Sequence, residues 1–267
     1  MKIIVATDFS ENANNALEFG IALAEKKGGK IILVHAIEPV LDPLVQGALG
    51  MEKIHDDAKA LMEDTIAMHP HANLEFEYII QEGTASLLVS RTAREINALL
   101  VVVGTQGTSG ILNTLIGSTT INLIKACSVP ILVVPSESLA MQVQRIVLGL
   151  EFTDRENKFI DWAIDMSQRW GRRLEFVHVQ TKDDFEEEAG LLKLEKYVLE
   201  NHQGIPMKIH TFYATTPVEG LDQFLEENEN VILVMCHEHK NLWEQILSRS
   251  QTIEMLFHSK VPLLIMP

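Results

Sequence analysis

Short runs of apolar, often β-branched residues alternate along this chain with longer stretches in which apolar residues recur every three or four positions. Residues 3–6 form the first short run, and apolar residues at helical spacing follow from 13 to 24. Ser10 stands where a helix N-cap is expected, and Gly28 stands where the helix should end. A second apolar run follows at 31–35. This order predicts a strand, a helix and a second strand.

The same pattern returns in the second half of the chain. Adding 143 to the position number pairs Asp8 with Glu151, and it also pairs their neighbours on both sides without a gap. Farther along, an offset of 132 pairs 129–135 with 261–267. The two offsets differ by 11, so the second half is shorter by that amount, and we expect the shortening in the connection that follows its second strand. The chain therefore consists of one unit that is repeated.

Strands that alternate with helical segments predict right-handed βαβ crossovers and a parallel sheet. Each half is expected to hold five strands and about four helices. We place the two α/β domains at 1–137 and 143–267, with a linker over 136–144. The strands of the first half are expected near 2–6, 30–35, 74–80, 99–103 and 130–134.

One glycine motif occurs only in the first half. A β-branched run ends at Gly104, Gly107 follows, and Gly117 precedes Ser118 at the start of another predicted helix. Glycine lets the backbone approach a ligand closely, and backbone N–H groups at a helix N-terminus favour an anion such as phosphate. The spacing predicts a phosphate-binding loop. The alternative is a flexible loop with a glycine helix cap.

The matching stretch of the second half has lost these glycines. At the offset of 132, Cys236, His239 and Arg249 replace Gly104, Gly107 and Gly117, and Ser250 alone matches Ser118. Side chains at these positions should block the approach of a phosphate. The run Cys-His-Glu-His at 236–239 contains metal-ligand side chains, but adjacent residues rarely converge on one ion. We expect neither nucleotide nor metal in the second half.

The opening Ile-Ile-Val-Ala-Thr-Asp-Phe-Ser, the glycine spacing followed by Gly-Ser, and the closing Val-Pro-Ile-Leu-Val-Val-Pro together carry a family resemblance. The chain resembles a tandem universal stress protein over nearly all of its length. The resemblance implies two Rossmann-like, doubly wound sheets of order 3-2-1-4-5, with the ligand at the carboxyl ends of the strands. It also implies an adenine nucleotide, usually ATP, and pairing of the two halves as a pseudo-dimer within one chain.

By this resemblance Asp8 holds the adenosine end of the nucleotide; the alternative is a loop acid that helps to start the following helix. No lysine or arginine lies within 104–119. The phosphate charge would then be met by backbone amides and by Mg²⁺. No catalytic residue is assigned. The expected binding residues are Ala6, Thr7, Asp8, Ala36, Val103, Gly104, Gly107, Gly117, Ser118 and Thr119.

Charge and composition restrict the class of partner. The net charge is −15, and both halves are acidic, so the basic footprint of a nucleic-acid binder is missing and an anionic membrane surface is disfavoured. The first acid stands at position 8 and no apolar run reaches the roughly 18 residues of a membrane span. Only two cysteines are present, which does not suggest a disulfide scaffold. We expect a cytoplasmic protein.

The sequence favours a nucleotide-dependent module of the stress response that binds one ATP per chain and signals to a protein partner not identified by the sequence. Two other functions stay open: a slow ATPase or phosphotransferase, and an interaction scaffold that binds no nucleotide. A homodimer of whole chains is also considered. His35 and His178 occupy paired positions at the ends of second strands. Because the pairing survives in the half without the glycines, we assign them a structural role.

Overall fold

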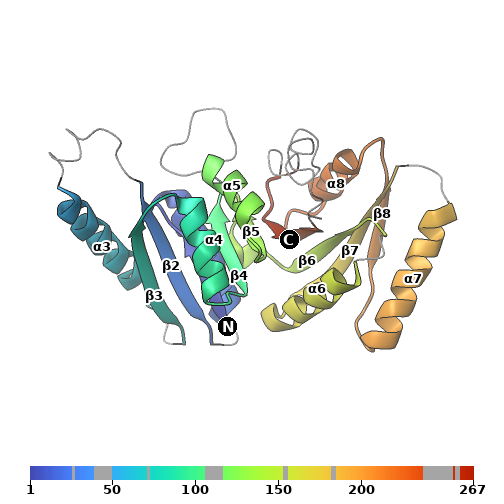
Figure 1. Cartoon of the computed structure of the whole chain (residues 1–267). Coiled ribbons are helices and arrows are strands. Elements are labelled where there is room, and N and C mark those ends of the chain that lie inside the picture. Colours follow the sequence, from blue (N-terminus) through green and yellow to red (C-terminus); the bar gives the residue numbers. More distant parts are fainter. Residues whose placement is uncertain are drawn as a thin grey trace. The chain divides into compact units, whose positions relative to one another are not determined.

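The computed structural model of the chain describes residues 1–25, 28–38, 50–70, 73–105, 117–152, 156–181, 185–236, 255 and 259–267. The described chain divides into two compact units (Figure 1). The first comprises Met1–Met141 with Pro267, and the second comprises Gln142–Met266. A short 3-10 helix, Ala140–Gln142, lies where they meet in the sequence.

The first unit is a parallel sheet of order β3-β2-β1-β4-β5, which is the predicted doubly wound order. Helices α4 and α5 pack against each other on the sheet, and α1 packs against β1, β4 and β5. The strands are β1 (Lys2–Ala6), β2 (Lys30–Ile37), β3 (Glu75–Glu82), β4 (Leu100–Gly104) and β5 (Ile131–Val134). The helices are α1 (Glu11–Ala24), α3 (Met51–Ala67), α4 (Ala85–Glu95) and α5 (Ser118–Ala126).

The second unit repeats this arrangement with strand order β8-β7-β6-β9-β10. Its strands are β6 (Arg145–Leu150), β7 (Arg173–Gln180), β8 (Ile209–Tyr213), β9 (Val231–Cys236) and β10 (Leu263–Met266). Its helices are α6 (Asn157–Trp170), α7 (Phe185–Asn201) and α8 (Pro217–Glu226). The tandem α/β fold is thus confirmed, while the pairing of the two halves as a pseudo-dimer stays a prediction.

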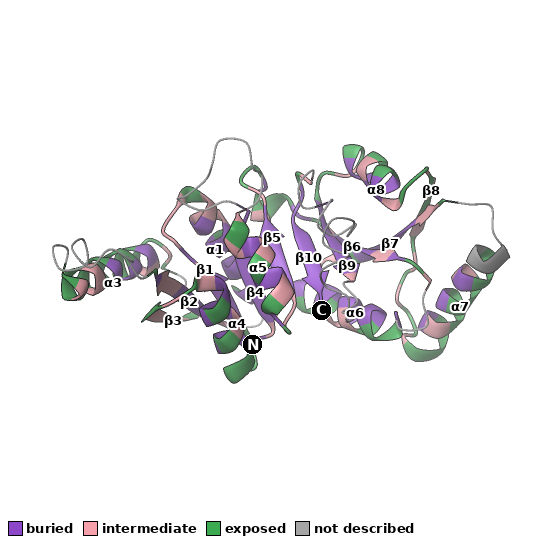
Figure 2. Ribbon diagram, turned by 45° about the horizontal axis from the view of Figure 1, so that its top comes forward, coloured by how far each residue is buried: buried purple, intermediate pink, exposed green. Residues whose placement is uncertain are grey.

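The central strands of both units are buried (purple in Figure 2), whereas the helices expose their outer faces. Ile3, Ile4 and Val5 of β1 are fully buried. A parallel strand covered by helices on both faces has no solvent side, so its residues are continuously apolar. This is why the short uninterrupted runs in the sequence mark the strands.

Backbone conformation repeats between positions that the offset of 143 pairs. Phe9 and Phe152 both have positive φ, at 63° and 56°, which is unusual for a bulky residue. Gly28 and Gly171 are also left-handed, at 64° and 58°, as expected of residues that end helices. The two halves therefore share particular turns as well as an order of elements.

The strand register places the shortening in the connection after the second strand, as predicted, but gives it a different size. His35 of β2 pairs with Ile80 of β3, whereas His178 of β7 pairs with Thr211 of β8. The position numbers differ by 45 in the first pair and by 33 in the second, so the connection up to this point is shorter by twelve, not by 11. The second unit is then longer by one residue between this point and its next helix. Thr84 and Thr216 are the N-caps of α4 and α8, and the offset of 132 pairs them, so the difference between the units is 11 again at these caps.

A buried ion cluster distinguishes the second sheet from the first. The carboxylate of Glu175 lies 2.9 Å from Arg145 Nη1, 2.8 Å from His210 Nε2 and 3.6 Å from Lys208 Nζ. Burial by itself raises the pKa of Glu175, but the hydrogen bonds from His210 and Arg145 outweigh it and hold the pKa below its ordinary value. The offset of 143 places Ile32 at this position in the first half.

Because the pKa of Glu175 is lowered from 4.5, the cluster should stabilise the folded state above about pH 4.5 and lose this effect as the pH falls through the lowered pKa. We expect Glu175→Gln to lower the free energy of unfolding by about 3 kcal/mol at pH 7 and by clearly less at pH 3. Urea unfolding followed by tryptophan fluorescence measures this, since all three tryptophans lie in the second half. The exposed Glu200→Gln serves as control, and an equal cost of Glu175→Gln at both pH values would contradict the assignment.

Within the part of the chain that the structure describes, none of the helices has the length and apolar character needed to cross a membrane.

Candidate functional site

A cavity of about 430 Å³ opens in the first unit where β1, β2 and β4 end. These carboxyl ends lie side by side because β1 pairs with β2 on one side and with β4 on the other. The chain reverses its winding direction between β1 and β4, and such a switch point is where doubly wound sheets bind ligands. The volume falls in the usual range for small-molecule sites, about 300–1,000 Å³.

The structure brings nine of the ten predicted binding residues to the wall of this cavity; the tenth, Gly107, lies outside the described residues. They come from four separate stretches of the sequence, at 6–8, 36, 103–104 and 117–119. The nine are Ala6, Thr7, Asp8, Ala36, Val103, Gly104, Gly117, Ser118 and Thr119.

Asp8 sits in a tight turn between β1 and α1. Its Oδ1 accepts a hydrogen bond of 3.1 Å from the N–H of Ser10, and the Ser10 hydroxyl in turn caps α1 by accepting from Ala13 N at 3.2 Å. The carboxylate therefore does help to start the helix, as the alternative interpretation held. The same bond fixes the carboxylate at the cavity wall, so the two roles are compatible.

His35 supports the turn that carries Asp8. Its Nδ1 lies 2.9 Å from the carbonyl oxygen of Thr7, and its ring contacts the Phe9 ring at a tilt of 40°, with centroids 4.5 Å apart. In the second unit, His178 makes the same contacts with Leu150 O, at 2.9 Å, and with Phe152, at 4.3 Å. Two copies of one arrangement, both holding a left-handed phenylalanine, agree with the structural role inferred for these histidines.

The two described glycines of the motif meet different surroundings. A Cβ on Gly104 would lie 3.0 Å from the backbone oxygen of Asn12, so a glycine here lets the end of β4 pack against the start of α1. Among the described residues a Cβ on Gly117 would meet Thr105 O alone, at 3.6 Å, which is ordinary contact, and the φ of Gly117 is −72°. In the first unit the backbone of Asn12 therefore disfavours a side chain at Gly104, whereas the described surroundings of Gly117 tolerate a Cβ.

Helix α5 begins at the cavity without a side-chain cap. Gly117 is its N-cap and offers no side-chain hydrogen bond to the first turn, while Ser118, Thr119 and Thr120 all line the cavity. The N–H groups of a first helical turn have no partner within the helix. Together with the helix dipole, they make this end of the cavity suited to an anion.

The charges around the cavity are not those of a basic phosphate pocket. Among its described lining residues the titratable side chains are Asp8, His35 and Glu38, with neither lysine nor arginine. The adjoining segments 39–49 and 106–116 also contain no lysine or arginine in the sequence. An anionic ligand would have to be met by backbone dipoles, hydroxyl groups and a cation bound with it.

Several lining residues escaped the sequence analysis. Thr120 donates its hydroxyl hydrogen to Gly104 O at 3.0 Å and so ties the two ends of the glycine segment together; it directly follows the motif, which was the available signal. Glu38, Ile54, Ala85 and Val89 also line the cavity. They lie on or beside other elements, and nothing in their sequence context marks them.

The corresponding region of the second unit is only partly described. Cys236 ends β9 and forms no disulfide, whereas His239, Arg249 and Ser250 lie outside the described residues. Helix α7 approaches the turn after β6 so closely that a Cβ on Gly190 would lie 2.5 Å from the Phe152 ring. No group of His, Cys, Asp or Glu arranged to hold a metal occurs among the residues described.

Comparison with known families decides the identity of the fold. The model of the universal stress protein family matches the chain twice, over residues 1–135 and 142–267. The chain belongs to the universal stress protein family. It is a tandem member, as the resemblance implied.

Individual relatives agree. A universal stress protein of Methanocaldococcus jannaschii is 27% identical over 151 residues, which cover 50% of this chain and 93% of that protein. One from Mycolicibacterium smegmatis is 25% identical over 189 residues, covering 66% of this chain and 63% of that protein. The crystal structure of a universal stress protein from Archaeoglobus fulgidus superposes with a TM-score of 0.79 at 17% identity, covering 99% of this chain and 97% of that one. This last likeness shows a shared tandem fold.

The different surroundings of the two glycines lead to different effects of an added methyl group. We expect Gly104→Ala to lower the free energy of unfolding of the first unit by about 1–3 kcal/mol through overpacking against Asn12. Gly117→Ala should change it by less than about 1 kcal/mol, because loss of the glycine cap and the gain in chain stiffness oppose each other. Urea unfolding followed by far-UV circular dichroism measures both. Equal costs for the two variants would show that the contact at Asn12 is not the cause.

Proposed function

We propose that this universal stress protein binds one adenine nucleotide, ATP, in its N-terminal half, and that nucleotide occupancy sets a state that a protein partner detects. The observation that carries the proposal is the convergence of Asp8 and the segments around Gly104 and Gly117 on one cavity at the switch point. The uncapped start of α5 at the same cavity adds an anion-binding element. The domain that binds is proposed to span 1–137, and 143–267 is proposed to serve as its partner domain.

The chemistry of the wall suggests how the ligand would lie. At one end, the carboxylate of Asp8 would accept hydrogen bonds from ribose hydroxyls, next to Ala6, Thr7 and Ala36. At the other end, the N–H groups of the first turn of α5 and the hydroxyls of Ser118 and Thr119 would donate to phosphate oxygens. The absence of a side chain at Gly117 would let the phosphates approach the backbone there.

Divalent metal would be part of this complex. The triphosphate of ATP would enter a cavity whose described charged side chains are carboxylates, Asp8 and Glu38. Mg²⁺ prefers to be held by phosphate oxygens, water and one or two carboxylates. Bound to the phosphates, it would supply the positive charge that the lining residues lack.

A binding module fits the site better than an efficient ATPase. Phosphoryl transfer depends on a positioned base and on cationic side chains around the transferred group. The described cavity lining offers no lysine or arginine, and the Nδ1 of His35 is already engaged with Thr7 O. We expect any hydrolysis of ATP to be slow.

A substitution that copies the second half tests the phosphate end. Gly117→Arg, the residue at the matching position 249, should weaken ATP binding by more than about tenfold, or about 1.4 kcal/mol, because its side chain would enter the space left for phosphates. Folding should be retained, since among the described residues the Cβ meets Thr105 O alone. Isothermal titration calorimetry measures the affinity. Asn122→Arg, on the exposed side of α5, is the matched control; wild-type affinity in Gly117→Arg would refute the assignment.

Stoichiometry and metal dependence form a separate test. Protein titrated with ATP in excess Mg²⁺ should bind one nucleotide per chain, and EDTA should weaken ATP binding by at least about tenfold because no lining cation replaces the metal. AMP, with less phosphate charge, should respond less to EDTA. If neither ATP nor AMP bound, the proposed function would be overturned. If two nucleotides bound per chain, the expectation that the second half binds no nucleotide would be wrong.

A further inference from the structure

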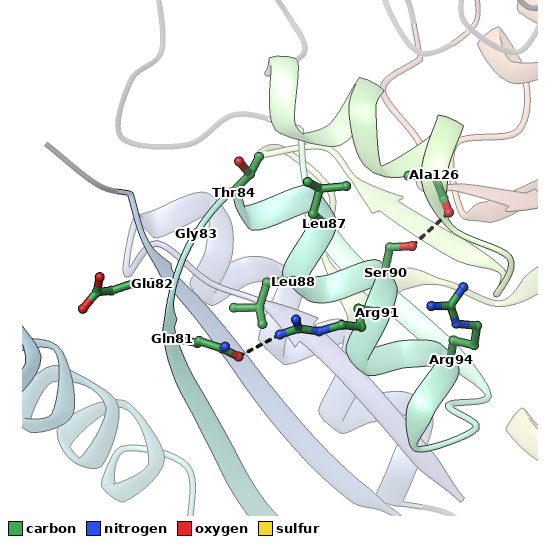
Figure 3. Close-up of a pocket in the computed structure, with 10 residues that line it drawn as sticks. All are labelled: Gln81, Glu82, Gly83, Thr84, Leu87, Leu88, Ser90, Arg91, Arg94 and Ala126. Atoms are coloured by element: carbon green, nitrogen blue, oxygen red, sulfur yellow. Dashed lines mark hydrogen bonds between the residues drawn. The ribbon is translucent and has the colours of Figure 1, made fainter. Parts of the chain in front are cut away.

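A second depression, about 460 Å³ in volume, lies on the outer side of α4 in the first unit (Figure 3). It is bounded by the end of β3 with the following turn on one side and by Ala126, at the end of α5, on the other. We refer to it as the α4 groove. Its lining includes residues 81–84 together with Leu87, Leu88, Ser90, Arg91, Arg94 and Ala126.

The charged side chains that line the α4 groove are two arginines and one carboxylate, that of Glu82. Arg91 reaches across to the end of β3, where its Nη2 donates to Gln81 Oε1 at 2.9 Å (dashed in Figure 3), and its Nε lies 3.9 Å from Glu95. Arg94, one turn farther along, is exposed and has no ion-pair partner among the described residues. The bond to Gln81 holds one guanidinium in place before a ligand arrives, which reduces the entropy lost on binding.

The same surface carries an apolar contact area. Leu87 is 63% exposed, whereas the neighbouring Leu88 is buried and forms part of the groove lining. The hydroxyl of Ser90 is satisfied by Ala126 O at 2.9 Å. An exposed leucine flanked by arginines is the composition of an interaction surface in which an apolar anchor is surrounded by polar contacts.

Helix α4 separates the α4 groove from the nucleotide cavity. Ala85 and Val89 line the cavity, while Thr84, Leu87 and Leu88 line the groove. A partner seated on the groove would contact the helix that forms a wall of the nucleotide site. That such a partner could detect the bound nucleotide rests on the proposed function, whereas the docking of the partner does not depend on it.

We propose that the α4 groove is the docking surface for a partner protein and binds a segment of it that carries aspartate or glutamate next to leucine-like side chains. Residues 1–137 hold nine basic against sixteen acidic side chains, a net charge of −7. Acidic segments are therefore repelled by most of this unit and attracted to the site of Arg91 and Arg94. Guanidinium groups match carboxylates in geometry as well as charge. Glu82, which also lines the groove, disfavours a doubly charged phosphate.

The test uses full-length protein without nucleotide and short fluorescein-labelled peptides. One peptide contains glutamate and leucine, a second has lysine in place of glutamate, and a third carries phosphoserine in place of glutamate. Fluorescence anisotropy should show saturable binding of the first peptide alone. Arg91→Glu with Arg94→Glu should weaken it by at least about tenfold. The matched control reverses two exposed charges on α3, Lys53→Glu with Lys59→Glu.

The proposal is supported if the glutamate–leucine peptide binds the wild-type protein and the control variant, and binding is lost only in the double arginine variant. The single variant Arg94→Gln, which leaves the bond between Arg91 and Gln81 intact, should then lose part of the affinity for this peptide. It is overturned if that peptide fails to bind, if the lysine or phosphoserine peptide binds as well, or if the control variant loses binding equally. Because nucleotide is absent, these results do not depend on whether the protein binds ATP.

Discussion

The pairing of β1 with two parallel neighbours is the constraint on which the candidate site depends. Parallel strands end on the same edge of a sheet, so pairing β1 with β2 and β4 brings together segments that are far apart along the chain. The change of winding direction between β1 and β4 leaves a gap that no crossover helix fills. The turn of Asp8 directly follows β1, and the start of α5 is tied to the end of β4 by the bonds from Gly117 N to Thr105 O and from Thr120 to Gly104 O, so both line one cavity.

Close contacts at the strand ends keep this arrangement fixed. Gly104 brings β4 against the backbone of Asn12, and Thr120 bonds back to Gly104 O. On the other side, His35 contacts the ring of the left-handed Phe9 and approaches Thr7 O. Left-handed backbone at a non-glycine residue costs energy that the surrounding structure must offset. The same phenylalanine–histidine pair in the second unit shows that it belongs to the fold and is independent of the glycine motif.

The two halves have used the shared scaffold differently. In the first unit a cavity lies beyond the strand ends, and in the second unit α7 lies against Phe152 at Gly190. The second sheet has also gained a buried carboxylate, Glu175, balanced by basic side chains from β6 and from the start of β8. Removing one member of such a cluster is costly because the charges of its partners are left without compensation.

The sequence by itself determined the repeat and the tandem α/β fold, because apolar runs, helix caps and glycine spacing are local signals that physical chemistry converts directly into elements. The nine residues that line the cavity were named from the glycine spacing together with the resemblance to the universal stress protein family. The sequence did not reveal the full extent of the shortening before β8, which is a matter of strand register, nor Ile54, Ala85 and Val89, which reach the cavity only by packing. Tertiary structure alone separated Gly104, where a Cβ would press on the backbone of Asn12, from Gly117, where a Cβ would make an ordinary contact with Thr105 O. A sequence records that both are glycines, but the reason for each lies in which atoms a Cβ would meet.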